Sequence, residues 1–306
     1  MIIGENSYIG KSFAEFAADK HEITTISSRD GTWRYADFAG FDAVLHCAGI
    51  AHVKQTKRMK PLYFDVNCDL AVEIARRAKD AGIGQFVFLS SMAVYGNSVS
   101  EIDGATPPNP NIGDYYGASK LQAENELGAL ADEKFKLSIV RPPMVYGKNC
   151  KGNFQRLVKL AKIMRVFPDY PNRRSMIFID NLSSFLCGII ESGASGIFLP
   201  QNKEYVNTTE LVGLIAEYYG KRITTTKLFN PLIRALIKKI SVFDKMFGDL
   251  FYTKHTQHTN NYKHTEHDNN TNHTNNYKHT QYTNHFKYCH NNDAVNFAES
   301  VRLSVM

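Results

Sequence analysis

The chain has 306 residues, of which 43% are hydrophobic and 22% are charged, the balance of a globular protein with room for a substantial core. Its 36 basic and 30 acidic residues leave a formal net charge of +6 spread along the chain, which gives no indication of a nucleic-acid-binding protein. No signal peptide opens the chain, no run reaches the roughly 18 apolar residues of a membrane span, and the cysteines are isolated, as in a cytoplasmic protein with reduced thiols.

The first half of the chain alternates short apolar runs with amphipathic stretches. Strands are predicted at 2–3, 21–26, 43–46, 86–89 and 137–140. Helices are predicted at 12–18, 66–81 and 116–131. Because strands that alternate with helices form parallel sheets, residues 1–147 predict a doubly wound α/β domain of the Rossmann type.

The first predicted strand is followed at once by GENSYIG, residues 4–10, a spacing typical of the turn between a buried strand and a helix. Only three residues precede Gly4. We expect this strand to be shortened, either by a start assigned too late or by a real truncation. A shortened central strand has fewer ladder hydrogen bonds and less buried apolar surface.

Residues 148–252 predict a smaller substrate-binding domain, with a strand at 175–179 and helices that begin at Asn181 and Thr208. The segment from about 174 to 200 is expected to return to the first domain. Over 230–252 an amphipathic run places Arg234 and Lys239 among leucines and isoleucines. A helix that lies on a membrane surface is one interpretation of this run, and a terminal helix that covers the small domain is the one we favour.

Residues 253–290 consist mostly of His, Thr, Asn, Tyr and Lys, and the sequence NNYKHT occurs in them twice. Too few aliphatic residues are present to offset the entropy of ordering such a tract, so we interpret it as a disordered insertion. Eight of the eleven histidines lie here without a fixed ligand spacing, and no functional metal site is expected. Residues 291–306 predict a C-terminal tail with an amphipathic stretch at 297–305.

The stretch DYYGASK, residues 114–120, carries the strongest chemical signal. Tyr116 and Lys120 are four residues apart, so on a helix both side chains reach one ligand. A nearby ammonium lowers the pKa of a phenol from about 10, which makes Tyr116 a candidate acid/base. Upstream, the apolar strand of FVFLSSMAVYG ends at Ser91, where parallel sheets bind their ligands, and its hydroxyl can hydrogen-bond the same substrate oxygen.

Three other segments fit a dinucleotide site at the same edge of the sheet. The strand of AVLHCAGIAH runs into Cys47, Ala48 and Gly49, small residues that let a cofactor approach the backbone. VNCDL is expected to begin a helix with Asn67, whose amide can hold main-chain or cofactor groups. RPPMVYG follows a strand with Pro143 in a stiff turn over the expected nicotinamide site.

Together and in this order, GENSYIG, SSMAVYG, YYGASK, RPPMVYG and NRRSMIFIDNL resemble the motifs of the extended short-chain dehydrogenases/reductases, specifically the NAD-dependent epimerase/dehydratase family that acts on nucleotide sugars. The chain is most similar to bacterial UDP-sugar 4-epimerase-like proteins of surface polysaccharide synthesis. The likeness runs from residue 4 to about residue 252 and resumes weakly near the C-terminus. It implies a bound dinucleotide, a UDP-sugar substrate and a homodimer formed through two helices, one of which bears Tyr116 and Lys120.

The resemblance assigns contacts to the cofactor pyrophosphate. GENSYIG matches the family's G-x-x-G-x-x-G, with Ser7 in place of the middle glycine. Gly4 would permit the tight turn and Gly10 the close packing of the helix, with the pyrophosphate at the helix N-terminus. The residues implied to surround it are Gly4, Ser7, Tyr8, Ile9 and Gly10.

The cofactor's ribose and adenine are assigned in the same way. Ser28 and Arg29 end the second strand, where an NAD enzyme often has an acid for the ribose hydroxyls. The family favours NAD, and Ser28 with Arg29 would suit the 2′-phosphate of NADP, which is the alternative. Asp37 and Phe38 stand where the family contacts adenine.

Substrate contacts are also implied. Asn153 and Arg174 match positions that hold the uridine diphosphate in related epimerases, and a guanidinium suits phosphate oxygens because its donors form a fixed fork. Ser91 and Met92 at the strand end are expected beside the sugar. Met144 in RPPM stands where well-known UDP-galactose epimerases carry an asparagine, so that substrate hydrogen bond is missing or replaced.

The resemblance implies a 4-epimerase. Tyr116 takes the proton of the sugar 4-hydroxyl, hydride passes to the nicotinamide, and the 4-keto sugar takes it back on its other face. A 4,6-dehydratase would need an acid pair after the strand-end serine, where this chain has Met92 and Ala93. A 4-keto-sugar reductase that uses NADPH would keep Ser91, Tyr116 and Lys120 and is the main alternative; the other is an inactive remnant of the family.

Overall fold

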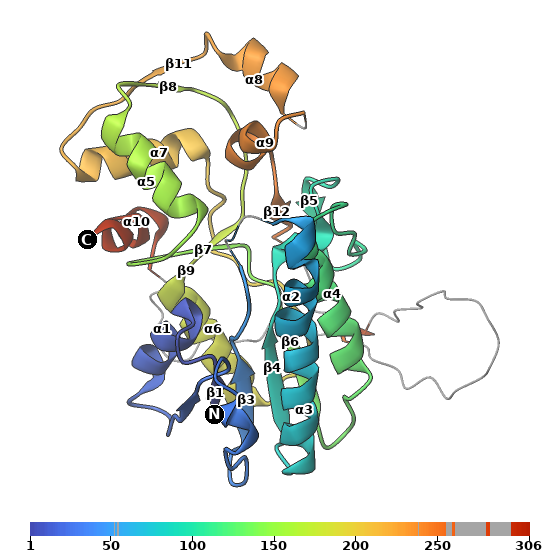
Figure 1. Ribbon diagram of the computed structural model, residues 1–306. Helices are drawn as coiled ribbons and strands as arrows, with labels where there is room; N and C mark the ends of the chain where they lie inside the picture. The colour runs from blue at the N-terminus through green and yellow to red at the C-terminus, as the bar shows by residue number, and fades with distance from the viewer. Residues whose placement is uncertain (52, 54, 238, 255–258, 261–279, 282–294) are drawn as a thin grey trace.

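The structure is a computed structural model, and it describes the chain apart from residues 52, 54, 238, 255–258, 261–279 and 282–294. A sheet with helices against both faces forms one part of the molecule, and a smaller group of helices and short strands lies beyond one end of the sheet (Figure 1). The described residues therefore have the α/β architecture that the alternating strands and helices predict.

Six parallel strands form the centre of the main sheet. In spatial order they are β2 (Thr25–Ile26), β1 (Ile2–Ile3), β3 (Ala43–His46), β4 (Gln85–Leu89), β6 (Lys136–Val140) and β10 (Gly196–Phe198). Beyond β10 the sheet continues with two antiparallel strands, β13 (Thr259–Asn260) and β14 (Thr280–Gln281). The chain runs from β1 to β2 on one side and to β3 on the other, so the strand order reverses between β1 and β3. Doubly wound sheets bind ligands at the carboxyl ends of strands at such a reversal.

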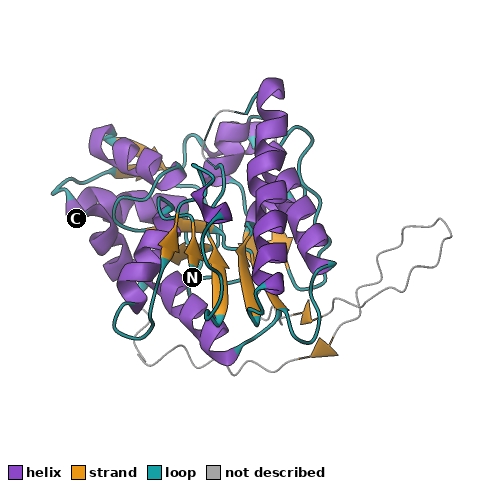
Figure 2. Cartoon of the chain, turned by 60° about the horizontal axis from the view of Figure 1, so that its bottom comes forward, coloured by secondary structure: helices purple, strands orange, loops and turns teal. Residues whose placement is uncertain are grey.

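Alternate side chains of the central strands face opposite helical layers, because successive residues of a strand point to opposite faces of the sheet. One face packs against α3 (Leu70–Asp80) and α4 (Tyr115–Gly128) through Val44, Phe86, Phe88, Leu137 and Ile139. The other packs against α1 (Tyr8–Ala17) and α6 (Ile179–Ser192) through Leu45, Val87, Leu89 and Val140. Figure 2 shows the helices on the two sides of the strands.

The first strand is as short as the sequence predicts, but it is fully integrated in the sheet. Ile2 and Ile3 are buried and pair with both β2 and β3. The backbone N–H groups of Leu45 and Cys47 donate to the carbonyls of Met1 and Ile3 at 2.9 Å. The strand predicted over 21–26 is reduced to Thr25–Ile26, because β1 offers only two residues with which to pair.

The helix predicted to begin at VNCDL is part of a longer helical run. η2 (Lys57–Met59) and α2 (Lys60–Phe64) lead into a π-helical turn, η3 (Asp65–Asp69), and then into α3. Asn67 therefore does not start a helix; it lies inside the π turn, a feature often found at functional sites.

The smaller part of the molecule has its own core. Its strand pairs are β7 (Met144–Tyr146) with β9 (Met176–Phe178) and β8 (Val166–Pro168) with β11 (Thr224–Thr226). Its helices include α5 (Asn153–Ile163), α7 (Thr208–Tyr218) and α10 (Phe297–Val305), so the amphipathic stretch predicted at 297–305 is confirmed as a helix. The Tyr146 ring stacks on Phe154, and its hydroxyl hydrogen-bonds Ser300 at 2.5 Å and Asn202 at 2.9 Å, which ties α10 to this core.

The single terminal helix predicted over 230–252 is wrong. The segment forms two short helices, α8 (Asn230–Leu236) and α9 (Ser241–Phe247), followed by β12 (Phe251–Tyr252), which pairs with β5 (Glu101–Ile102). Tertiary contacts override the helical pattern here: the Tyr252 N–H donates to Ser175 Oγ at 2.8 Å and its hydroxyl donates to the Arg141 carbonyl at 2.7 Å.

The tract predicted to be disordered, 253–290, lies outside the described residues except for Thr253, Lys254, β13 and β14. In the described part of the chain, Cys47, Cys68, Cys150 and Cys187 carry free thiols. No helix among the described residues combines the length and the apolar character that crossing a bilayer requires.

Candidate active site

The glycine loop closes tightly against the end of β3. Gly4 has a φ of +110°, and a Cβ atom there would lie 2.8 Å from the backbone nitrogen of Ala48, so only glycine fits. A Cβ on Gly10 would lie 3.2 Å from the Gly4 carbonyl oxygen. Ser7 is the N-cap of α1, and its hydroxyl accepts from the Gly10 N–H at 3.4 Å. The first turn of α1 contains no acidic residue, so its free N–H groups and helix dipole can receive a pyrophosphate.

Asn67 holds the loop that follows β3. Its Oδ1 accepts from the Ile50 N–H at 2.7 Å, and its Nδ2 donates to the Ile50 carbonyl at 3.2 Å and to Ser119 Oγ at 3.0 Å. A Cβ on Gly49 would lie 2.9 Å from Asn67 Oδ1 and 3.4 Å from Lys120 Nζ. Asn67 of the π turn and Lys120 of α4 thus pack closely against the Gly49 backbone and leave no room for a side chain there.

The three candidate catalytic side chains converge. Ser91 caps η4 (Met92–Tyr95) directly after β4, and its side chain accepts from the Ala93 N–H at 3.2 Å. Its hydroxyl also hydrogen-bonds the phenol of Tyr116. Lys120 is one turn further along α4, and its ammonium donates to the Leu89 carbonyl at 2.8 Å, at the carboxyl end of β4. Ser91 and Tyr116 are therefore in contact, and the Lys120 ammonium lies at the carboxyl end of β4, the edge of the sheet where the sequence predicts the site.

Burial is the largest influence on the pKa values of Tyr116 and Lys120. It raises the pKa of Tyr116, and the hydrogen bond from Ser91 opposes that rise. It lowers the pKa of Lys120 to about 8, against the raising influence of Cys47, Glu124 and Cys68. The expectation that Lys120 lowers the pKa of Tyr116 is wrong for this structure, because the ammonium is directed at the Leu89 carbonyl and over the Phe88 ring, 4.5 Å from its centroid.

A buried ion pair that the sequence analysis missed lies behind the candidate catalytic residues. Glu124, one turn beyond Lys120, forms a bidentate pair with Arg141 at the end of β6, and the two residues are 2% and 5% exposed. Arg141 Nη1 donates to the Tyr95 hydroxyl at 2.6 Å, and the Ser90 hydroxyl donates to Glu124. The network joins the residue before Ser91 to the helix of Tyr116. Its only signal in the sequence is a carboxylate four residues after Lys120.

A second missed residue, Gln55, holds the start of α4. Its side-chain oxygen accepts from the Tyr115 N–H at 2.6 Å and the Tyr116 N–H at 3.3 Å, and its amide donates to Asp114 at 2.9 Å. Asp114 is itself the N-cap of α4 and accepts from the Gly117 N–H. These bonds satisfy N–H groups that a helix leaves without intrahelical partners, and they fix the turn that carries Tyr116.

The residues assigned to the adenosine end of the cofactor divide into exposed and buried positions. Ser28 and Arg29 follow β2, next to the glycine loop, since the Gly4 and Glu5 N–H groups both donate to the Ile26 carbonyl. Arg29 is exposed. Asp37 is exposed and accepts from the Ala39 N–H at 2.9 Å. Phe38 is 2% exposed and belongs to the core between the sheet and α3, so its ring serves as core packing in this structure.

The apolar residues assigned to the site are buried or half-buried. Pro143 is buried directly before β7, and the Met92 N–H donates to the Pro142 carbonyl at 3.0 Å. The Met92 side chain is 6% exposed and packs in a core with Val94 and Tyr252, whereas Met144 is half-buried.

Tyr8, Ile9 and Cys47 lie around the glycine loop. Tyr8 and Ile9 both pack against the core of the smaller domain, and a Cβ on Gly147 would lie 2.5 Å from the Tyr8 hydroxyl. Burial raises the pKa of the Cys47 thiol to about 12, so the thiol is protonated at neutral pH.

The two residues assigned to the uridine diphosphate lie apart from the trio, in the smaller domain. Asn153 is exposed at the first position of α5. Arg174 is half-buried; its guanidinium donates to the carbonyl of Gly248 at 2.8 Å and, more weakly, to that of Asp244 at 3.4 Å. Burial lowers the pKa of Arg174, against the raising influence of Asp244 and Asp249. In this arrangement Arg174 fastens α9 to the strand region.

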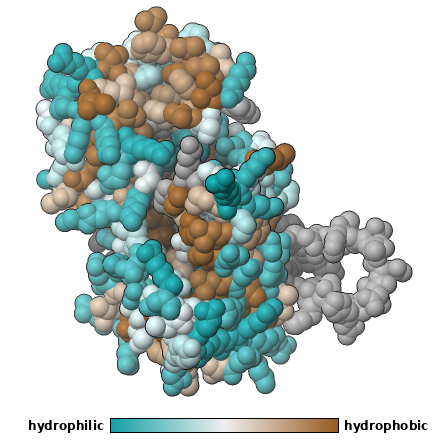
Figure 3. Space-filling view, viewed as in Figure 1, coloured by the Kyte–Doolittle hydropathy of each residue, from teal (hydrophilic) through white to brown (hydrophobic). Residues whose placement is uncertain are grey.

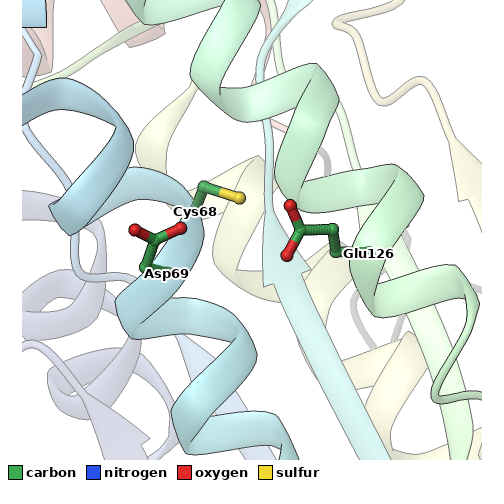
Figure 4. Close-up of side chains that lie close together, drawn as sticks. All are labelled: Cys68, Asp69 and Glu126. Carbon is green, nitrogen blue, oxygen red and sulfur yellow. The ribbon is translucent and has the colours of Figure 1, made fainter. Parts of the chain in front are cut away.

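One further cluster of potential ligand atoms lies on the outer side of the helical layer. Cys68 and Asp69 from η3 meet Glu126 from α4, with their ligand atoms within 4.8 Å of one another (Figure 4). Burial raises the pKa of Cys68 to about 12, and the charges and hydrogen bonds of Glu126 and Asp69 act in the same direction. A protonated thiol hydrogen-bonded to two carboxylates joins η3 to α4, and it is a poor metal ligand because metals bind the thiolate.

Comparison with known proteins agrees with this geometry. The sequence profile of the NAD dependent epimerase/dehydratase family matches residues 1–196. A UDP-glucose 4-epimerase of Vibrio cholerae is 34% identical over 231 residues, which is 70% of each chain. The N-acetyl-alpha-D-glucosaminyl-diphospho-ditrans,octacis-undecaprenol 4-epimerase of Escherichia coli O157:H7 is 29% identical over 255 residues, 76% of each chain. This chain therefore belongs to the NAD-dependent epimerase/dehydratase family.

Solved structures share the fold. A dTDP-4-dehydrorhamnose reductase of Clostridium acetobutylicum has a TM-score of 0.63 at 20% identity, over 74% of this chain and 81% of that one. A UDP-glucuronic acid 4-epimerase of Bacillus cereus, in complex with NAD, has a TM-score of 0.61 at 17% identity, over 74% of this chain and 85% of that one. Both an epimerase and a reductase thus use this architecture.

Proposed function

We propose that the chain is an NAD-dependent 4-epimerase of a diphosphate-linked hexose, with a UDP-sugar as substrate. The observation that carries the proposal is the hydrogen bond between Ser91 and Tyr116, with Lys120 one turn along α4, beside a backbone cradle in which glycine is the residue that fits. Gly4, Gly10 and Gly49 line that cradle, and the N-terminus of α1 is free of acidic side chains, as a dinucleotide pyrophosphate requires. A bound NAD would supply a nicotinamide that accepts hydride from the sugar and returns it.

In the proposed reaction Tyr116 transfers the proton, and Ser91 and Lys120 support it. Tyr116 would take the proton of the sugar 4-hydroxyl as hydride leaves C4, and would return it after the 4-keto sugar has turned. The Ser91 hydroxyl, already bonded to the Tyr116 phenol, would hydrogen-bond the same sugar oxygen. Ionisation of Tyr116 costs free energy in this buried site, so the Lys120 ammonium must move from the Leu89 carbonyl toward the phenolate or the cofactor ribose during the reaction.

The diphosphate end would lie in the smaller domain. Arg174 presents a guanidinium at the end of α9 and Asn153 an amide at the start of α5, and both groups suit phosphate oxygens. The two most extensively matched relatives named above act on sugars that are both diphosphate-linked, one to uridine and one to a polyprenol. The similarity supports a diphosphate-linked hexose as substrate. Between a UDP-sugar and a polyprenol-linked sugar, we propose the UDP-sugar. Both substrates and NAD are consistent with a cytoplasmic site of action.

The experiment that tests the proposal is an incubation without reductant. The purified chain with NAD and UDP-glucose or UDP-N-acetylglucosamine should yield the C4 epimer, detected by the anomeric and H4 signals in proton NMR. Loss of product with Tyr116→Phe ties the activity to this site. No epimer from any diphosphate-linked hexose, together with retained NAD binding, would overturn the proposal.

A keto-sugar reductase is the second candidate, because Arg29 stands exposed after β2 where a guanidinium can meet the 2′-phosphate of NADP. Its signature would be stoichiometric oxidation of NADPH with a 4-keto sugar and no epimerisation with NAD. An inactive family remnant would bind neither dinucleotide in a calorimetric titration. A homodimer through two helices, one of which is α4, as the resemblance implies, is testable on the same preparation by sedimentation.

A further inference from the structure

The segment that joins the smaller domain to β12 exposes an unusual concentration of apolar side chains. Within 228–242 the exposed fractions are 78% for Leu228, 43% for Phe229, 57% for Leu232, 43% for Ile240 and 62% for Val242. Figure 3 shows hydrophobic residues gathered at the end of the molecule where Figure 1 places α8. Single exposed leucines are ordinary, but an exposed group of this kind marks an interaction surface.

Each of these helices places one fully buried side chain in the core. Ile233 is the buried residue of α8 and Phe247 that of α9, at 2% and 4% exposure. Each helix has only seven residues, and at this length its own propensity does not hold it folded in water. The outward apolar side chains therefore do not serve the internal stability of the domain, and they remain available to a partner.

The same segment is strongly basic. Residues 227–245 contain five basic residues and one acidic residue, a net charge of +4 out of +6 for the whole chain. Arg234, Lys239 and Lys245 are exposed beside the apolar group. Lys227 lies 3.9 Å from Asp169, so its charge is partly compensated. We call Leu228, Phe229, Leu232, Ile240 and Val242, together with Arg234, Lys239 and Lys245, the α8–α9 face.

The α8–α9 face adjoins the region assigned to the substrate. A hollow of about 460 Å³ is lined on one side by Lys239, Ser241 and Asp244, and on the other by Asn97, Ser98 and Asn111, which follow η4 in the chain. Arg174, the candidate diphosphate ligand, donates to the carbonyls of Asp244 and Gly248 at the end of α9. A partner bound to this face would lie next to this hollow and near the Arg174 guanidinium.

We propose that the α8–α9 face docks the protein on an anionic lipid surface. Apolar side chains fringed by cations match the boundary between acyl chains and anionic headgroups, whereas either kind of residue alone would not. A second copy of the chain fits this face poorly, because a twofold contact places the same basic face on both sides of the interface, where the Arg234, Lys239 and Lys245 charges of the two copies repel. The docking is reversible and peripheral, since the helices are short and lie on the outside of the fold.

Flotation of the full chain with lipid vesicles tests the proposal without any substrate, so its outcome is independent of the proposed reaction. The protein should float with vesicles of phosphatidylglycerol and phosphatidylcholine, and much less with phosphatidylcholine alone. Added salt should weaken the binding because it screens the headgroup charge. Each neutralised cation should lower the partition coefficient about fivefold, so Arg234→Gln with Lys245→Gln should lower it about 25-fold. Leu232→Glu with Val242→Glu should abolish it.

Matched controls lie at the other end of the molecule. Tyr35, 90% exposed, and Lys134, also exposed, belong to the sheet half, so Tyr35→Glu and Lys134→Gln should float like the wild type. The charge variants change only exposed groups and keep the proposal testable if the apolar variants unfold, which circular dichroism detects. Absence of flotation with anionic vesicles, or equal flotation of wild type and face variants, would overturn the proposal. Lipid-independent dimers that Leu232→Glu dissociates, without vesicle binding, would identify the face as a self-association surface and would also overturn it.

Discussion

Helices α4 and α8 differ in what they bury. On α4, Lys120 and Glu124 are 4% and 2% exposed, and every one of their charges meets a carbonyl, a hydroxyl or an opposite charge. On α8, Leu232 is 57% exposed and Arg234 faces solvent, while Ile233 alone is buried. Charged groups are inside in one helix and apolar groups are outside in the other.

The difference teaches where each kind of function resides. Burying charged groups costs free energy because they lose water. Once they are hydrogen-bonded, they hold the surroundings of Tyr116 in one geometry, in a medium of low dielectric. Exposed apolar side chains do not add to the core of the folded chain. They gain hydrophobic free energy only when a partner covers them. Substitutions in α4 and its surroundings test whether buried charge and close packing have the large effects that this difference implies.

The largest effect is expected from Tyr116→Phe. Loss of the phenol removes the acid/base group, and the rate of epimer formation should fall about 100- to 10,000-fold, the usual worth of such a group. NAD affinity, measured by calorimetry, should change little, since the backbone cradle is intact. Tyr115→Phe, one residue earlier on α4, is the matched control and should keep its activity. Undiminished turnover by Tyr116→Phe would remove the tyrosine from the mechanism.

Arg141→Met should cost about 3–5 kcal/mol of unfolding free energy, because it leaves the Glu124 carboxylate buried without its guanidinium. Urea unfolding followed by fluorescence measures the change. In the double variant Arg141→Met with Glu124→Met the loss should be smaller, since no charge stays behind. Glu73→Gln breaks the exposed pair with Arg34, whose side chains are 51% and 52% exposed, and should cost under about 1 kcal/mol. If Arg141→Met and Glu73→Gln lowered the unfolding free energy equally, burial would not be what makes the Glu124–Arg141 pair important for stability.

Lys120 should give stability a distinct pH dependence. Burial lowers its pKa from 10.5 to about 8, so between these values the unfolded chain binds more protons than the folded one. The unfolding free energy of the wild type should therefore rise with pH, relative to Lys120→Met, by up to about 1.4 kcal/mol per pH unit in that window. Lys134→Met, at an exposed site, should show no such slope. A wild type that loses stability relative to Lys120→Met from pH 8 to 10 would contradict the burial of the ammonium.

Gly4→Ala tests whether the glycine loop tolerates a side chain. A positive φ alone costs an alanine about 1–2 kcal/mol, and this cost should appear at Gly40, where φ is +79° and no atom lies within 4 Å of a Cβ. At Gly4 the contact with Ala48 at 2.8 Å adds to it. Gly4→Ala should therefore unfold more easily than Gly40→Ala and should also bind NAD more weakly in calorimetric titration. Identical behaviour of the two variants would mean that the cradle tolerates a side chain.

Much of the sheet half was predictable because its signals are local. The apolar run at 43–46 is β3 as predicted, and the strand-end serine and the Tyr116–Lys120 spacing lead to side chains that do meet. The ion pair of Glu124 with Arg141 was not predictable, since the two residues are 17 positions apart and neither has a distinctive neighbour. The two short helices and β12 in place of one helix were missed for a related reason: the periodic pattern is helical, and the contacts of Tyr252 that hold β12 are with residues remote in sequence.

The sequence by itself determined the kind of chemistry, because a glycine-spaced loop and a tyrosine four residues before a lysine act within one turn or one helix. The tertiary structure decided the state of those groups. It directs the Lys120 ammonium to the Leu89 carbonyl and raises the pKa of Tyr116 by burial, and it leaves the α8–α9 face uncovered. Proton affinity and exposure depend on everything that surrounds a side chain, and what surrounds it comes from distant parts of the chain.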